Sequence, residues 1–126
     1  MTTPIGHRLQ IAAWHTLQST RGEPVQYYTR TGLYIEIPLA VLTQPKTSRI
    51  ELTDAIGFES RRWEWLIDPE DLVLTDGTPI TPAHGHWIIR SKDDSKFVLS
   101  PNARDLVWRW SDASQIWRRV YTEEVT

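Results

Sequence analysis

The chain contains no cysteine among its 126 residues. This absence excludes a disulfide framework, a thiolate metal site and a cysteine nucleophile. Only six glycines are present, and no glycine-rich loop precedes a predicted helix to hold a phosphate group. The Gly-x-Ser-x-Gly pattern of many hydrolases is also missing. We therefore expect a protein that is not an enzyme and that needs no cofactor.

Basic residues are not in excess, because 14 lysines and arginines face 16 acidic residues and the net charge is −2. Binding to DNA through its phosphates normally requires such an excess. No apolar run approaches the length of a membrane span, and the first ten residues lack the layout of a signal peptide. We expect a soluble chain that is made in the cytosol.

Tryptophan and arginine are the residues that the chain has in abundance. Seven tryptophans are present, and arginines outnumber lysines by eleven to three. Both residue types are enriched where proteins contact proteins, although tryptophan also fills cores. The length fits one domain spanning residues 1–126, with a helix in residues 1–21 and a β-barrel in residues 22–126.

The segment Thr3–Arg21 predicts an α-helix, because Thr3 can cap it, Pro4 suits its first position and Gly22 can end it. Ile11 and Trp14 share one side of this helix. They indicate either a surface for a partner or a site covered by a loop. The opposite stripe is suited to packing on a core, and it consists of Ile5, Leu9, Ala12, Ala13, Thr16 and Leu17.

After Gly22 the hydrophobic period changes from helical to two, which predicts a mostly β structure. Seven or more short strands with turn signals between them indicate a small antiparallel β-barrel or sandwich behind the N-terminal helix. The segments with strand character are Val25–Arg30, Tyr34–Ile37, Arg49–Thr53, Ser60–Ile67, Leu72–Leu74, His86–Arg90, Lys96–Ser100, Val107–Trp110 and Trp117–Thr122. Pro38 and Pro45 favour an edge strand or an extended loop after Ile37.

The segment Ser60–Ile67 is the clearest strand. Alternation predicts one face with Arg61, Trp63, Trp65 and Ile67, and another with Arg62, Glu64 and Leu66. Such a face of cations and aromatics, repeated at Trp108-Arg109-Trp110 and Trp117-Arg118-Arg119, is one way to stack single-stranded nucleic acid. A half-buried sheet that turns tryptophans inward and arginines outward produces the same pattern, and the near-neutral charge favours this interpretation.

Two groups of residues invite a metal. His84 and His86 are two positions apart and would need further ligands from His7, His15 or a carboxylate. The acidic residues around Asp68 and Asp76 lack the spacing of a calcium loop. Capping of a helical turn that begins at Pro69 explains Asp68, and the Asp76-Gly77 turn explains Asp76. We therefore predict no metal ligands.

The order of several short motifs resembles the small head–tail joining proteins of tailed bacteriophages and prophages. The most specific part is Trp108-Arg109-Trp110-Ser111-Asp112, followed by Trp117-Arg118-Arg119-Val120-Tyr121-Thr122. Earlier segments are also similar, namely Ile11–Leu17, Val25–Arg30 and Trp65–Leu74. The chain departs from the pattern at Ala113, where the family has proline, and at its end, where Tyr121-Thr122-Glu123 replaces a basic His-Thr-Lys ending.

The resemblance implies a structural protein of the virion neck that is made in the bacterial host cytoplasm. It would form an oligomeric ring between portal or adaptor and tail proteins, with packaged DNA passing through the lumen without specific binding. The adaptor, head-closure and tail-completion roles all stay open. The side chains that we predict for partner contacts are Ile11, Trp14, Arg61, Trp63, Arg109 and Arg118.

Two other hypotheses compete with this connector. One is a small barrel that binds single-stranded nucleic acid or a peptide through its tryptophan and arginine face. The other is a metal-dependent enzyme that uses His84, His86 and a distant carboxylate.

Overall fold

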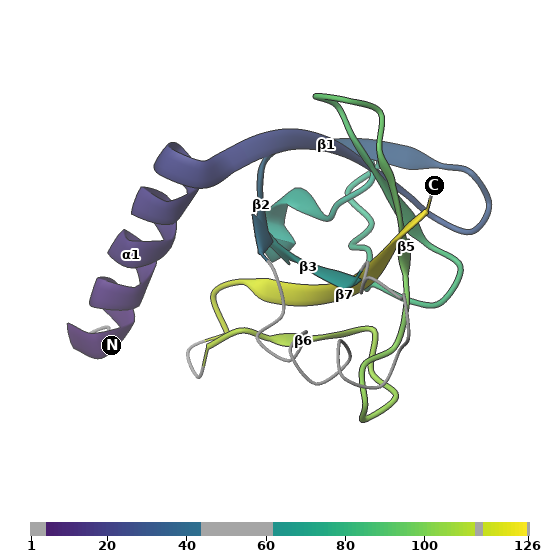
Figure 1. Cartoon of the computed structure of the whole chain (residues 1–126). Coiled ribbons are helices and arrows are strands. Elements are labelled where there is room, and N and C mark those ends of the chain that lie inside the picture. The colour runs from purple at the N-terminus through teal and green to yellow at the C-terminus, as the bar shows by residue number, and fades with distance from the viewer. Residues whose placement is uncertain (1–4, 44–61, 113–114, 126) are drawn as a thin grey trace.

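A computed structural model describes residues 5–43, 62–112 and 115–125 of the chain. One helix, α1 (Ile5–Arg21), precedes an antiparallel β structure (Figure 1). The strands are β1 (Gly22–Tyr28), β2 (Tyr34–Thr43), β3 (Arg62–Ile67), β4 (Trp87–Arg90), β5 (Lys96–Leu99), β6 (Trp108–Trp110) and β7 (Arg118–Val125), and a 3-10 turn, η1, spans Pro69–Asp71. The predicted mostly β fold behind one helix is confirmed.

Six of these strands close into a barrel. Their order is β3-β2-β1-β4-β5-β7, and a further pairing of β3 with β7 completes the circle. The long strand β7 has two neighbours on its other edge, since its first residues pair with β6 and its last residues pair with β5. Every pairing in the described part of the chain is antiparallel.

Alternation along the strands fills the barrel with apolar side chains. On β3, Trp65 and Ile67 are fully buried in the interior, and Trp63 packs against the same core. Leu66 points to the outside and belongs to a separate cluster. The predicted faces of this strand are thus confirmed for residues 62–67, whereas Ser60 and Arg61 lie outside the described residues. Trp65 meets Phe97 of β5 edge-on, with ring centroids 5.3 Å apart.

Strand β2 runs through Pro38, so of the two predicted alternatives after Ile37 the chain forms a strand and not an extended loop. Its last residues, Val41–Thr43, pair with β3 as well, so the strand is not an edge there. The pairing between β1 and β2 shifts by one residue, because Glu23 faces Ala40 whereas Val25 faces Ile37. Such a bulge is where a strand tolerates a residue without an N–H donor. Pro45 and the predicted strand Arg49–Thr53 lie outside the described residues.

The predicted turn at Asp76-Gly77 and the predicted helical turn at Pro69 are confirmed. Gly32 and Gly77 both have a φ of 90°, which favours glycine, and their N–H groups donate to Thr29 and Leu74 respectively. Asp68 caps η1 by accepting from the N–H of Glu70 at 2.9 Å.

The predicted strand at Leu72–Leu74 is reduced to a single bridge between Val73 and Pro79. The turn at Asp76-Gly77 follows η1 so closely that no longer pairing can form. Leu72 and Ile80 from this segment are nevertheless buried in the barrel core. The segment therefore fills the interior of the barrel and is not part of its wall (Figure 1).

Helix α1 packs through the side opposite to the predicted one. Trp14 is 1% exposed, and its indole stacks on Trp117 with ring centroids 5.0 Å apart. Leu9 is 66% exposed, and Ala12, Ala13 and Thr16 are exposed as well. Of the predicted core stripe, Leu17 packs against the Trp14 cluster.

The size and polarity of the tryptophan explain this rotation of the helix. Burying an indole removes far more apolar surface from water than burying alanines does. Trp14 covers Val41 and Leu66, which point outward from β2 and β3. Its N–H donates to the Asp68 carboxylate at 3.2 Å. The helix is thus fixed to the barrel wall and not to the barrel core.

The helix continues directly into β1 without a linker. Arg21 is the last helical residue and Gly22 is the first residue of the strand. A Cβ atom at position 22 would lie 2.3 Å from the carbonyl oxygen of Gln18 and 2.9 Å from Cβ of Leu39. Only glycine fits this junction, so the direction of the helix is determined by the start of the strand (Figure 1).

Tyr27 and His86 form a polar pair within the barrel. The Tyr27 hydroxyl lies 2.7 Å from Nδ1 of His86, and the two rings meet edge-on. Burial raises the pKa of Tyr27, which keeps its hydroxyl protonated. Burial and the nearby Arg30 cation lower the pKa of His86, which favours the neutral ring. A protonated hydroxyl can therefore donate to the unprotonated ring nitrogen.

Replacement of Trp14 tests how the helix is attached. We expect Trp14→Ala to lower the free energy of unfolding by roughly 3–5 kcal/mol, since a large buried side chain and its hydrogen bond are lost. The matched control Leu9→Ala should change it by less than about 0.5 kcal/mol, because this side chain is exposed. Urea unfolding followed by tryptophan fluorescence measures both. A larger loss for Leu9→Ala would show that the predicted stripe faces the barrel after all.

The His86 ring should make stability depend on pH. Its pKa in the folded chain is lower than its ordinary value of 6.5, so the unfolded chain takes up a proton first. Stability is therefore greatest above pH 6.5 and falls as the pH decreases below it. Urea unfolding at pH 7.5 and 5.5 should show a smaller decrease for His86→Gln than for the unsubstituted chain. Equal decreases would exclude His86 as the cause.

Candidate interaction surfaces

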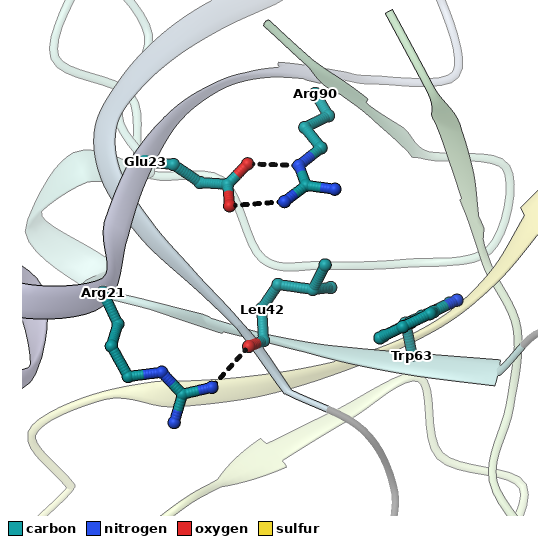
Figure 2. Close-up of a pocket in the computed structure, with 5 residues that line it drawn as sticks. All are labelled: Arg21, Glu23, Leu42, Trp63 and Arg90. Atoms are coloured by element: carbon teal, nitrogen blue, oxygen red, sulfur yellow. Dashed lines mark hydrogen bonds and ion pairs between the residues drawn. The ribbon is translucent and has the colours of Figure 1, made fainter. Parts of the chain in front are cut away.

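An open pocket of about 500 Å³ lies at one end of the barrel. Its walls come from the end of α1, the start of β1, the ends of β2 and β4, and the start of β3. Figure 2 shows the five lining residues, which are Arg21, Glu23, Leu42, Trp63 and Arg90. The elements that form the pocket therefore meet where the helix joins the barrel.

The charges in this pocket are largely paired. Arg90 holds both carboxylate oxygens of Glu23, with Nη2 to Oε2 at 2.9 Å (Figure 2). The hydrogen bond to Glu23 raises the pKa of Arg90. Arg21 donates to the carbonyl oxygen of Leu42 at 3.4 Å. Trp63 adds a partly exposed indole. This arrangement suits contact with a polar or apolar partner group.

The other notable cation, Arg118, lies between two tryptophans. Its guanidinium carbon is 4.5 Å from the ring centroid of Trp108 and 5.2 Å from that of Trp110. It also donates to the carbonyl oxygen of Ile80 at 3.0 Å. Burial lowers the pKa of Arg118, and the nearby Tyr27 opposes this effect. The cluster binds β6 and β7 to the segment that fills the barrel.

The structure does not bring the predicted contact residues together. Trp14 is buried and offers no free surface, whereas Ile11 on the same helix is partly exposed. Trp63 lies in the pocket, and Arg109 is exposed on β6. The remaining two are Arg118, which is part of the tryptophan cluster, and Arg61, which lies outside the described residues. Whether any of them contacts a partner stays a prediction.

The alternation of tryptophan and arginine follows the period-two rule of a half-buried sheet. On β3, Trp65 faces the core, whereas Glu64 on the outer face forms an ion pair with Arg119 of β7. Arg62, also on the outer face, donates to the carbonyl oxygen of Pro101. In the described part of β3, the tryptophans and the arginine thus lie on opposite sides of the wall and do not form one platform.

The residues considered for metal binding have other neighbours. His86 contacts Tyr27, and His84 lies exposed in a loop where its carbonyl oxygen accepts a hydrogen bond from Arg30 at 3.0 Å. Asp76 accepts from the N–H of Thr78 at 2.9 Å, as expected of a turn. Within residues 5–43, 62–112 and 115–125, no three histidine or acidic side chains are grouped in a way that could hold a metal ion.

An aromatic row crosses the outer wall of the barrel and was not recognised in the sequence. It consists of three aromatic residues, Tyr34, Tyr28 and Trp87, and of Val98 at its end. These residues lie opposite one another on β2, β1, β4 and β5. Tyr28 stacks on both Tyr34 and Trp87, with ring centroids 5.1 Å apart in each pair. Lys96 of the next row lies over the Trp87 ring at 5.1 Å.

This row depends on strand register, which explains why it was missed. Tyr28 and Trp87 are 59 positions apart, and Tyr28 alone would be read as one more outward residue of a strand. Only the pairing of β1 with both β2 and β4 places the three rings side by side. The pairing of Tyr28 with Tyr34 could be predicted from the sequence, because Tyr34 follows Tyr28 across a short turn at Thr31-Gly32.

Comparison with known proteins agrees with the resemblance found in the sequence. A family model described as phage head-tail joining protein matches residues 5–126. No curated protein and no solved structure matches the chain. In the parts that the structure describes, no helix has both the length and the apolar character needed to cross a membrane.

The match covers α1 and every strand of the barrel. The chain therefore belongs to the phage head–tail joining protein family, whose description implies contact with head and tail components of a phage and a place in the neck of the virion.

Proposed function

We propose that the chain is a structural subunit of the phage neck that assembles into a ring between the portal and the tail, without catalysis. The observation that carries this proposal is the family match over residues 5–126, which includes both the barrel and its helix. The architecture supports it, because six strands that close into a barrel form a rigid body.

Ring assembly requires two different surfaces on each subunit, since head-to-tail contacts close by rotation. The described residues offer apolar groups on separate parts of the molecule. Leu9 is exposed on α1, and Tyr34 is exposed on the barrel wall. Large exposed apolar side chains that lie in patches indicate contact with other proteins. The subunit would thus work through its surfaces.

The charge of the chain suits a ring around DNA. A net charge of −2 gives no general attraction for phosphates. DNA that passes through the lumen would then meet few strong contacts and could slide. This favours a passage over a specific nucleic-acid site, in agreement with the absence of a tryptophan and arginine platform on the described part of β3.

Loss of the gene tests this function. We expect a phage or induced prophage that lacks the chain to produce heads and tails that are not joined, because the part that connects them is missing. Electron microscopy of the lysate counts joined particles, which should decrease by at least about tenfold. Supply of the unsubstituted chain from a plasmid should restore them.

Two outcomes would contradict the proposal. One is a normal yield of joined particles without the chain. The other is purified joined particles in which mass spectrometry detects no copy of it.

A further inference from the structure

Helix α1 presents an apolar stripe to solvent. Leu9, Ala12, Ala13 and Thr16 lie on one side of the helix and are exposed, and we call them the outer stripe. Their spacing is that of a helix face that packs against a partner. Since Trp14 attaches the opposite side to the barrel, the chain itself leaves this stripe uncovered. A helix with such an apolar face commonly packs on another protein surface.

The aromatic row is the second uncovered apolar surface. Tyr34 is 52% exposed, and Tyr28 and Trp87 are partly exposed. In the next row along the wall, Ile89 extends the apolar area. Aromatic residues are enriched in protein interfaces, where their flat rings supply large contact area at little cost in conformational entropy.

These two surfaces cannot meet within one chain. The helix joins β1 at Gly22, whereas the aromatic row crosses β1 at its other end, at Tyr28. Six residue steps along a strand separate them by about 20 Å. The glycine junction and the buried Trp14 hold the helix in place. Figure 1 shows α1 pointing away from the barrel, on the side opposite β5.

We propose that the outer stripe of one copy packs on the aromatic row of a second copy of this chain. The inference rests on the proposed ring, and it names the surfaces through which neighbouring subunits touch. Every copy has one stripe and one row on different parts of the molecule. The contact is therefore head-to-tail and repeats from copy to copy, which is the kind of contact that closes into a ring.

The two surfaces match in size. Four adjacent strands span about 14 Å, since neighbouring strands lie about 4.8 Å apart. The outer stripe rises about 10 Å from Leu9 to Thr16. Ala12 and Ala13 at its centre are small, so the helix backbone can approach the flat rings closely. The larger Leu9 then extends past one edge of the alanines and can contact an aromatic ring.

The charges also favour this pairing over a contact between two identical faces. Helix α1 contains no acidic residue, and Arg21 at its end is directed to the pocket on the barrel side. The barrel wall near the row carries the exposed carboxylates of Glu36 and Glu123. A stripe without carboxylates can approach this wall without repulsion from Glu36 and Glu123, and Lys96 already lies over the Trp87 ring. Two aromatic rows face to face would bring the carboxylates together instead.

Cysteine cross-linking in assembled particles tests the contact, and the natural chain has no cysteine to interfere. The phage would carry the double variant Ala13→Cys with Glu36→Cys, which has one thiol in the outer stripe and one beside the aromatic row. Purified joined particles are treated with a short bismaleimide reagent and analysed on a denaturing gel. We expect a ladder of dimers, trimers and larger species of the chain.

The control variants separate this contact from others. Each single variant should give no cross-link between copies, since one cysteine has no counterpart on the neighbouring surface. Ala13→Cys combined with Arg104→Cys, which is exposed in the loop after β5, should also give no ladder. Leu9→Glu in the double variant should reduce the ladder by at least about fivefold and leave the unfolding of the isolated chain unchanged.

Several outcomes would overturn the inference. Dimers from Glu36→Cys alone would show a symmetric contact between two aromatic rows. Cross-links only to another virion protein would show that these surfaces contact that protein and not a second copy of the chain. Particles that contain the chain but give no ladder would disprove the contact and leave the neck function intact. Joined particles without the chain would instead disprove the proposed function itself.

Discussion

Pairing of β3 with β7 turns a sheet into a barrel, and the other features depend on this closure. Arg62 lies opposite Glu123 at one end of the pairing and Ile67 lies opposite Arg118 at the other. Without it, β3 would have an open edge and the buried Trp65 would lose its neighbour Val120 on β7. Closure also fixes the curvature of the wall, which brings the aromatic row to the outside and the Arg118 cluster to an end of the barrel.

Local patterns predicted the local structure well. The helix end at Gly22, the turns at Gly32 and Gly77, and the two faces of β3 all follow from residue type and period. Two features needed information from elsewhere in the chain. Pro38 continues a strand at a bulge, where two residues of β2 between Ile37 and Ala40 lie opposite one residue of β1. The predicted helix face was wrong, because that face depends on what the barrel wall offers to Trp14.

The surfaces were predicted less well than the fold. Periodicity predicted that the stripe around Leu9 and Ala12 packs on an apolar surface, but it does not identify that surface. The structure leaves this stripe exposed, so it does not pack on the core of the same chain. The aromatic row needs the register of four strands, and no local pattern contains that register. Among the predicted contact residues, Trp14 shows how a side chain suited to an interface can be used inside the chain.

The direct junction between α1 and β1 has a mechanical consequence. A pull on the N-terminal part of the helix is not absorbed by a flexible linker, since Gly22 of β1 directly follows Arg21 of α1. The load would pass first to the Trp14 contacts and then along β1. Hydrogen bonds to β2 and β4 lie across that strand, so a pull along it loads them together in shear. The helix is thus attached to a strand that is paired on both of its edges.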